Sequence, residues 1–146
     1  IVPFAGVGPF VLMIAKSQPK STVVGIELNA QAVKLFKENS VLNKLKNVNV
    51  ILGDAKKELL AFKGKASRIL TPLPWSSREF LPECISALRS RGILHYYFFA
   101  RDSREGLEDV KKACAVQGRR CSLKDSRVVH GYSASMQQYV LDLEIE

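Results

Sequence analysis

Hydrophobic and polar residues alternate along this chain in blocks that are typical of a parallel α/β sheet. Short β-branched or aliphatic runs are each followed by a polar turn and then by a longer stretch with helical spacing. The segment at residues 22–27 is apolar almost throughout, as expected of a strand that is buried on both faces. The strands of this first part are predicted at residues 1–4, 22–27, 47–52, 68–71 and 93–99.

Helices are predicted between these strands, because apolar side chains recur there every three or four residues. They cover residues 10–16, 29–43, 55–62, 76–89 and 102–116, the third being the weakest. The expected amino-terminal caps are Asn29, either Ser76 or Ser77, and either Asp102 or Ser103. The inner side of the second helix is predicted to carry Ala32, Val33, Leu35, Phe36 and Leu42.

The last part of the chain follows a different pattern. Two strands are predicted at residues 120–130 and 138–145 with no helix between them, so they are expected to pair antiparallel. No repeat, low-complexity tract or linker interrupts the chain, which predicts a single domain over residues 1–146. Residue 1 already lies inside the first strand. We therefore expect the first strand to be truncated and further sequence to precede it.

Composition is that of an ordinary globular domain. The 146 residues are 47% hydrophobic and 25% charged, and no apolar run reaches the length of about 18 residues that a membrane span needs. The three cysteines form no CxxC pair and the two histidines lie far apart, so no metal site is expected. These features favour a soluble, cytoplasmic protein with reduced thiols and no metal or membrane partner.

The net charge of +8 is compatible with a polyanionic partner. One basic cluster comprises Lys56, Lys57, Lys63, Lys65 and Arg68, and a second comprises Arg119, Arg120, Lys124 and Arg127. Such cations supply sequence-independent affinity for phosphates, although a solvated basic surface is an equally good interpretation of each cluster. The RNA-binding candidates are Lys56, Lys57, Lys63 and Lys65 of the first cluster, together with Arg78, which lies outside both clusters.

A glycine-rich turn follows the first predicted strand. It reads Phe4-Ala5-Gly6-Val7-Gly8 and runs into Pro9. Glycines at this place let the backbone turn tightly and let a ligand approach it closely. A third glycine at dinucleotide spacing is absent, so the turn suits a nucleoside with an amino-acid tail better than a dinucleotide. A purely structural turn is the alternative.

Two acids follow the next strands of the predicted sheet. Glu27 ends the second strand, where an acid accepts hydrogen bonds from ribose hydroxyls in nucleotide-binding sheets. Asp54 follows the third strand, where a carboxylate can accept the exocyclic amine of adenine. A helix cap is an equally good interpretation of Asp54. The glycine turn and the two acids are more specific together than any of them alone.

This combination is the pattern of class I S-adenosylmethionine-dependent methyltransferases. The turn around Gly6 and the segments 51–55, 93–97, 131–133 and 139–142 resemble the archaeal and eukaryotic tRNA guanosine-37 N1-methyltransferases over essentially the whole chain. The resemblance implies a Rossmann-like, mostly parallel seven-stranded sheet with an antiparallel C-terminal strand pair. It implies S-adenosylmethionine as cofactor, tRNA as partner and methyl transfer to N1 of guanosine 37. The cofactor-binding residues would be Phe4, Ala5, Gly6, Val7, Gly8, Glu27, Leu28, Asp54 and Ala55.

The resemblance also places the target base. The family's Asn-Leu-Pro motif after the fourth strand corresponds here to Pro72, Leu73 and Pro74, followed by Trp75, which would stack on the base or merely pack. The family's catalytic glutamate and arginine lie upstream of the glycine turn, so we expect them before Ile1. No catalytic residue is therefore assigned within the chain, although removing the N1 proton requires a general base.

Two alternatives remain open. The related wybutosine-pathway enzyme uses the same cofactor to transfer an aminocarboxypropyl group to the same tRNA position. The absence of an Asn-Leu-Pro motif favours it slightly, whereas the segment His95-Tyr96-Tyr97 favours the methyltransferase. The third possibility is a degenerate domain that binds S-adenosylmethionine or RNA without catalysis.

Overall fold

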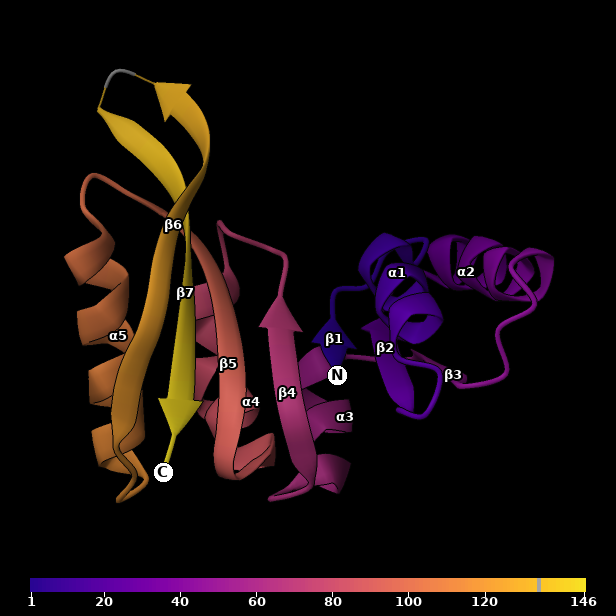
Figure 1. Cartoon of the computed structure of the whole chain (residues 1–146), viewed down its shortest axis with the longest axis horizontal. Helices are drawn as coiled ribbons and strands as arrows, with labels where there is room; N and C mark the ends of the chain where they lie inside the picture. The colour runs from indigo at the N-terminus through magenta and orange to yellow at the C-terminus, as the bar shows by residue number, and fades with distance from the viewer. Residues whose placement is uncertain (134) are drawn as a thin grey trace. The chain divides into compact units, whose positions relative to one another are not determined.

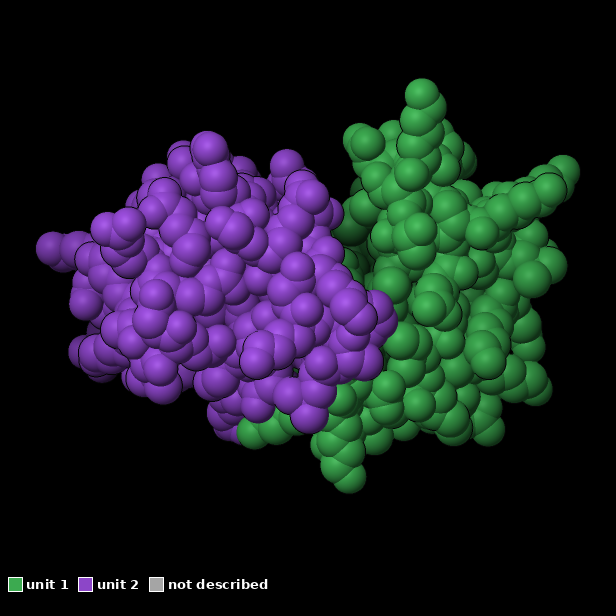
Figure 2. Space-filling view, turned by 90° about the horizontal axis from the view of Figure 1, so that it is seen from below, with its two compact units in different colours: residues 1–58 green, residues 59–146 purple. Residues whose placement is uncertain are grey.

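The computed structural model describes residues 1–133 and 135–146, and the side chain of Tyr132 is left out of the description. The chain divides into two compact units, residues 1–58 and 59–146 (Figure 2). Each unit has its own hydrogen-bonded sheet.

The first unit alternates strand and helix, as predicted (Figure 1). Its elements are β1 (Val2–Pro3), α1 (Pro9–Ser17), β2 (Val23–Glu27), α2 (Ala30–Leu42), β3 (Val48–Leu52) and α3 (Ala55–Glu58). All pairing in the order β1-β2-β3 is parallel. Because the strands run the same way, their carboxyl ends and the segments that follow them meet at one edge of the sheet.

The second unit is a mixed sheet with helices. It contains a 3-10 turn η1 (Leu59–Phe62), β4 (Ala66–Thr71), a 3-10 turn η2 (Ser77–Phe80), α4 (Leu81–Ala87), β5 (Leu88–Ala100), α5 (Ser103–Val116), β6 (Cys121–Ser133) and β7 (Met136–Ile145). The strand order is β4-β5-β7-β6. β4 and β5 are parallel, whereas β7 is antiparallel to both β5 and β6, which confirms the predicted C-terminal strand pair.

Side chains alternate along β5 between a buried and a half-buried face. Leu94, Tyr96 and Phe98 are buried, whereas Tyr97 and Phe99 on the other face are half-buried. This alternation follows from the two-residue period of a strand. Tyr96 therefore lies in the core, whereas Tyr97 lies on the half-buried face.

The expected single seven-stranded sheet is wrong as a description of the hydrogen bonding. The described residues form one three-stranded parallel sheet and one four-stranded mixed sheet. β1 has only two residues, and the second of them, Pro3, lacks an N–H group. Such a strand offers few backbone groups for a second neighbour beyond β2.

Three predicted segments also differ. Residues 55–62 form α3 followed by η1, not one helix, and residues 76–89 form η2 and α4, after which β5 begins at Leu88 instead of Ile93. Neither Ser76 nor Ser77 caps a helix with its side chain. On α2, Val33 and Phe36 are buried as predicted, but Leu35 and Leu42 are exposed. The inner side of α2 is therefore narrower than its apolar residues suggest.

Caps predicted from the sequence are confirmed at two helices. The Asn29 side chain accepts hydrogen bonds from the backbone N–H groups of Gln31 and Ala32 at the start of α2. Asp102 accepts from the N–H of Arg104 at the start of α5 and forms a capping box with Glu105.

Candidate functional site

The glycine-rich turn between β1 and α1 is built from left-handed backbone. Phe4, Gly6 and Gly8 have φ angles of 59°, 56° and 91°. A left-handed conformation is uncommon for a bulky residue such as Phe4, and such residues cluster at ligand-binding sites. The five predicted turn residues therefore form one constrained loop directly after the sheet edge.

Gly8 is required by packing inside the first unit. A Cβ atom at this position would lie 2.2 Å from the ring of Phe36, a fully buried residue of α2. Gly25 on β2 meets the same ring, since its Cβ would lie 2.4 Å from Cε1 of Phe36. The second glycine of the turn thus has a structural explanation that needs no ligand.

Gly6 has the opposite surroundings. A Cβ at Gly6 would meet no atom of the described residues within 4 Å. Its N–H group donates a hydrogen bond of 2.8 Å to Oε2 of Glu27. The backbone at Gly6 is therefore open on the side where a ligand would approach, and the end of β2 holds it in place.

Glu27 links the turn to the following loop. Its Oε1 accepts from the N–H of Asn29 at 2.8 Å, while Oε2 accepts from Gly6. An ionised carboxylate has about four acceptor positions, so two such bonds leave capacity for further donors. The adjacent Leu28 is 71% exposed and offers an apolar surface beside this carboxylate.

Asp54 lies at the same edge, after β3. The N–H of Gly53 donates to the carbonyl oxygen of Glu27 at 2.9 Å, which brings the end of β3 against the end of β2. Oδ1 of Asp54 accepts from the N–H of Lys56 at 2.9 Å, so this side chain caps α3. The structure therefore brings Gly6, Glu27 and Asp54 to one edge of the sheet, and Ala55 follows as the buried first residue of α3.

The predicted target-base segment lies in the second unit, between β4 and η2. It contains Pro72, Leu73, Pro74 and Trp75. Trp75 is 60% exposed, and its ring packs on Phe99 near the carboxyl end of β5 with ring centroids 4.4 Å apart. Trp75 therefore packs against Phe99 and also exposes ring surface on which a base could stack.

In the second basic cluster, several side chains form ion pairs with acidic residues of the protein. Lys124 pairs with Glu144 at 3.4 Å, and Arg127 pairs with Asp142 at 3.1 Å. Among the RNA-binding candidates, Lys56 and Lys57 lie on α3, Lys63 and Lys65 follow η1, and the Lys65 ammonium donates to the carbonyl of Ala61. Arg78 pairs with Asp109 at 2.8 Å, although its side chain remains 69% exposed.

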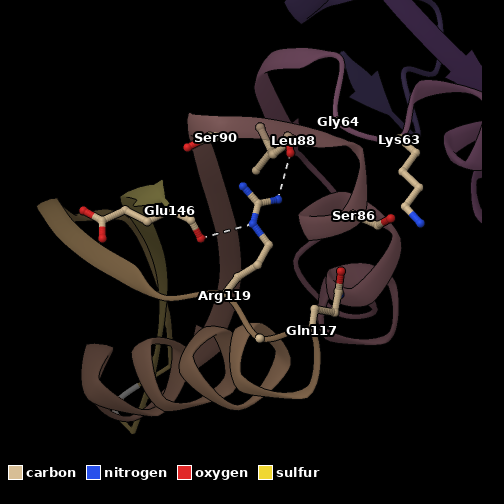
Figure 3. Close-up of a pocket in the computed structure, with 9 residues that line it drawn as sticks. Lys63, Gly64, Ser86, Leu88, Ser90, Gln117, Arg119 and Glu146 are labelled. Atoms are coloured by element: carbon tan, nitrogen blue, oxygen red, sulfur yellow. Dashed lines mark hydrogen bonds between the residues drawn. The ribbon is translucent and has the colours of Figure 1, made fainter.

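Arg119 of the second cluster lines a surface cavity of about 630 Å³ (Figure 3). Its guanidinium group donates to the carbonyl oxygens of Ile85, Leu88, Arg89, Ile145 and Glu146. These bonds use all five N–H donors that an arginine possesses. Arg119 therefore holds the α4–β5 junction against the end of β7, and it has no donor left for a phosphate.

Sequence reasoning missed two features of these sites. The fully buried Ser77 donates a hydrogen bond from its hydroxyl to the carbonyl of Tyr97. Nδ1 of His95 lies 2.7 Å from Asp142, which also binds Arg127. Neither arrangement has a local signal, because each joins residues that lie on different strands or turns and are far apart in the sequence.

Two other kinds of feature, a membrane-spanning helix and a metal site, are not present among the residues that the structure describes. No helix in this part of the chain is long and apolar enough to cross a membrane. Within the same residues, no three His, Cys, Asp or Glu side chains are grouped so that they would hold a metal ion.

Comparison with known proteins gives consistent matches. The family model of the TRM5/TYW2 methyltransferase domain matches residues 1–124. The tRNA (guanine(37)-N(1))-methyltransferase Trm5b of Pyrococcus abyssi is 32% identical over 145 residues, which are 97% of this chain and 42% of that protein. The crystal structure of M. jannaschii TYW2 in complex with AdoMet has a TM-score of 0.92 and 28% identity, covering 99% of this chain and 67% of that one.

A further solved structure, the complex of aTrm5 and tRNALeu, has a TM-score of 0.84 and 27% identity, and it covers 99% of this chain and 40% of that one. These similarities establish an α/β methyltransferase fold. The chain spans less than half the length of the Pyrococcus relative.

Proposed function

Because this chain belongs to the TRM5/TYW2 methyltransferase domain family, we propose that it binds S-adenosylmethionine and transfers the methyl group to N1 of guanosine 37 in a tRNA. The relatives support a tRNA-modifying transferase that uses this cofactor. Methyl transfer is the more specific proposal, and the identity of 32% to the Pyrococcus methyltransferase favours it.

One observation carries the cofactor proposal. The left-handed Gly6 position is open, and its N–H group is bonded to the Glu27 carboxylate at the edge where Asp54 also lies. Gly6 would let the amino-acid tail of the cofactor approach the backbone. Glu27 would accept the ribose hydroxyls with its remaining acceptor positions, and Leu28 would contact the adenine ring.

The other residues proposed to bind the cofactor lie at the same edge of the sheet. Phe4, Ala5, Val7 and Gly8 would shape the turn, while Asp54 and Ala55 would contact the adenine. The cofactor itself supplies the electrophilic carbon of the transferred group. This chain's residues would bind and orient it. On this proposal, residues 1–146 belong to one cytoplasmic methyltransferase domain, and Pro72–Trp75 contact the target base.

A second candidate is aminocarboxypropyl transfer to the same position. The observation that favours it is the TM-score of 0.92 to M. jannaschii TYW2, compared with 0.84 to aTrm5 bound to tRNA. The added mass on the tRNA nucleoside separates the two reactions, because an aminocarboxypropyl group is much heavier than a methyl group.

Calorimetric titration of this chain with S-adenosylmethionine tests the cofactor proposal first. We expect Glu27→Ala and Asp54→Ala each to weaken binding at least tenfold, about 1.4 kcal/mol. Asp54→Asn keeps an oxygen that can cap α3, and it therefore separates the cap from the ligand contact. Glu38→Ala, an exposed acid on α2, is the matched control.

Unchanged affinity in both alanine variants would remove Glu27 and Asp54 from the site. A folded chain that binds no S-adenosylmethionine would overturn the cofactor proposal and would leave a degenerate domain that binds RNA as the alternative. Mass analysis of a tRNA incubated with the chain would then distinguish residual transfer from none.

A further inference from the structure

The segment at residues 72–76 is fastened to β5 at both ends by buried hydroxyl groups. Before it, Oγ1 of Thr71 donates to the carbonyl of His95 at 3.3 Å and accepts from the N–H of Tyr97 at 3.4 Å. After it, Oγ of Ser77 donates to the carbonyl of Tyr97 at 2.6 Å. Thr71 and Ser77 are both fully buried. Two short polar side chains thus fix where the segment leaves the sheet and where it returns.

Ser77 has a second partner on the same strand. Burial raises the pKa of Tyr96 to about 12, and the Tyr96 side chain is hydrogen-bonded to Ser77. Burial is the larger effect on Tyr96, and the hydrogen bond with Ser77 lowers its pKa in part. Ser77 thus interacts with two neighbouring residues of β5, Tyr96 and Tyr97.

The segment between these anchors has little freedom of its own. Pro72 and Pro74 have fixed φ angles. The N–H of Ser77 donates to the carbonyl of Leu73 at 2.9 Å, which closes the turn. The position of Trp75 therefore depends on the anchors more than on the segment's internal flexibility.

Trp75 and Phe99 form an aromatic pair, and Phe99 lies one residue before the carboxyl end of β5, which runs parallel to β4. The Trp75 ring is inclined by 38° to the Phe99 ring and is 60% exposed. Ligands of parallel sheets bind beyond the carboxyl ends of the strands, and nucleobases stack on exposed aromatic rings.

We propose that Ser77 is a positioning residue that holds Trp75 on Phe99, so that the indole ring forms the platform on which the unstacked target purine rests. This inference rests on the proposed tRNA substrate. It adds Ser77 and Phe99 to the site, and Ser77 acts only through Trp75.

The test uses the full chain and its single tryptophan, Trp75, as a fluorescent reporter. The probes are an anticodon stem-loop RNA with guanosine at position 37 and the same RNA with an abasic residue there. The wild-type chain is expected to bind the guanosine RNA about tenfold more tightly than the abasic RNA, with quenching of Trp75. In Ser77→Ala this preference should largely disappear, while affinity for the abasic RNA stays unchanged.

Ser76→Ala is the matched control, because the Ser76 side chain forms no cap bond, and it should behave as the wild type. If Ser77→Ala fails to fold, Phe99→Leu replaces it and should reduce the preference in the same way. A folded Ser77→Ala chain with an undiminished preference would overturn the proposal.

A second readout needs no RNA. The fluorescence anisotropy of Trp75 should fall in Ser77→Ala and not in Ser76→Ala, because the ring gains motion when its anchor is removed. If the wild type binds neither RNA, the proposed function fails, and the anisotropy alone decides the role of Ser77. Equal anisotropy in wild type and Ser77→Ala would overturn that role independently.

Discussion

Gly6 and Gly8 differ in what surrounds them, although they stand two positions apart. Gly8 is closed in by the Phe36 ring, and Gly6 faces open space. The same substitution at the two positions is therefore expected to have different effects.

We predict that Gly8→Ala destabilises the protein by about 2–5 kcal/mol, since it adds overpacking to left-handed strain. Gly6→Ala should cost only about 1–2 kcal/mol, the strain alone. Urea unfolding of each variant measures these values. Phe36→Leu should recover part of the stability in Gly8→Ala, and equal destabilisation by the two alanines would contradict the packing argument.

Single residues also show what the sequence reveals and what it hides. The juxtaposition of Gly6, Glu27 and Asp54 could be predicted, because it follows from three parallel strands and the residues directly after them. The contact between Gly8 and Phe36 could not, since it depends on how α2 crosses the sheet. Ser77 resembles a cap because serines commonly begin helices, but its hydroxyl binds a strand carbonyl 20 residues away.

At the scale of the elements, the amino-terminus of α5 is closed by a capping box. Asp102 accepts hydrogen bonds from the backbone and the side chain of Arg104, and these bonds lower the pKa of Asp102 to about 2. A carboxyl group whose pKa is lowered on folding stabilises the native state above its unfolded pKa of about 3.9. That stabilisation is lost as the pH falls through the folded pKa.

We therefore predict that Asp102→Ala lowers the Tm at pH 7 and that its difference from wild type narrows as the pH is lowered from about 4 to about 2. Thermal melts followed by circular dichroism at a series of pH values measure this. Ser103→Ala is the neighbouring control and should leave the Tm near that of wild type. A pH-independent difference would show that the carboxylate charge contributes nothing.

Element boundaries are predictable where a cap marks them and unpredictable where the chain bulges. The caps of α2 and α5 are recognisable because asparagine and aspartate precede amphipathic stretches. The predicted start of β5 is several residues late, because Arg89-Ser90-Arg91-Gly92 has the composition of a turn. In the structure these residues lie within the strand, where the register with β4 shifts between Ala66 and Arg68.

At the scale of the whole molecule, the net charge is +8, but some of the basic side chains are already bound to other groups of the protein. Arg119, Lys124 and Arg127 are bound by carbonyl or carboxylate groups of the protein. The lysines around α3 and η1 are the set of predicted RNA contacts that lies outside this second cluster.

We predict that changing Lys56, Lys57, Lys63 and Lys65 to Glu weakens tRNA binding and flattens its salt dependence, by roughly 0.9 in slope for each phosphate that is no longer neutralised. Affinity measured across a range of salt concentrations gives the slope. Changing Lys16, Lys20, Lys34 and Lys37 to Glu alters the net charge equally and should affect the slope less. An equal effect of both sets would assign the binding to net charge alone.

The five bonds of Arg119 also have a consequence for the order in which the second unit can form. They join residues 26 to 34 positions apart, from the end of α4 to the end of β7. During synthesis this junction cannot be completed until the end of β7 has been made. The bonds to Ile145 and Glu146 are therefore the last part of this junction to form. An interaction made late in folding chiefly slows unfolding, so Arg119 contributes to the lifetime of the native state.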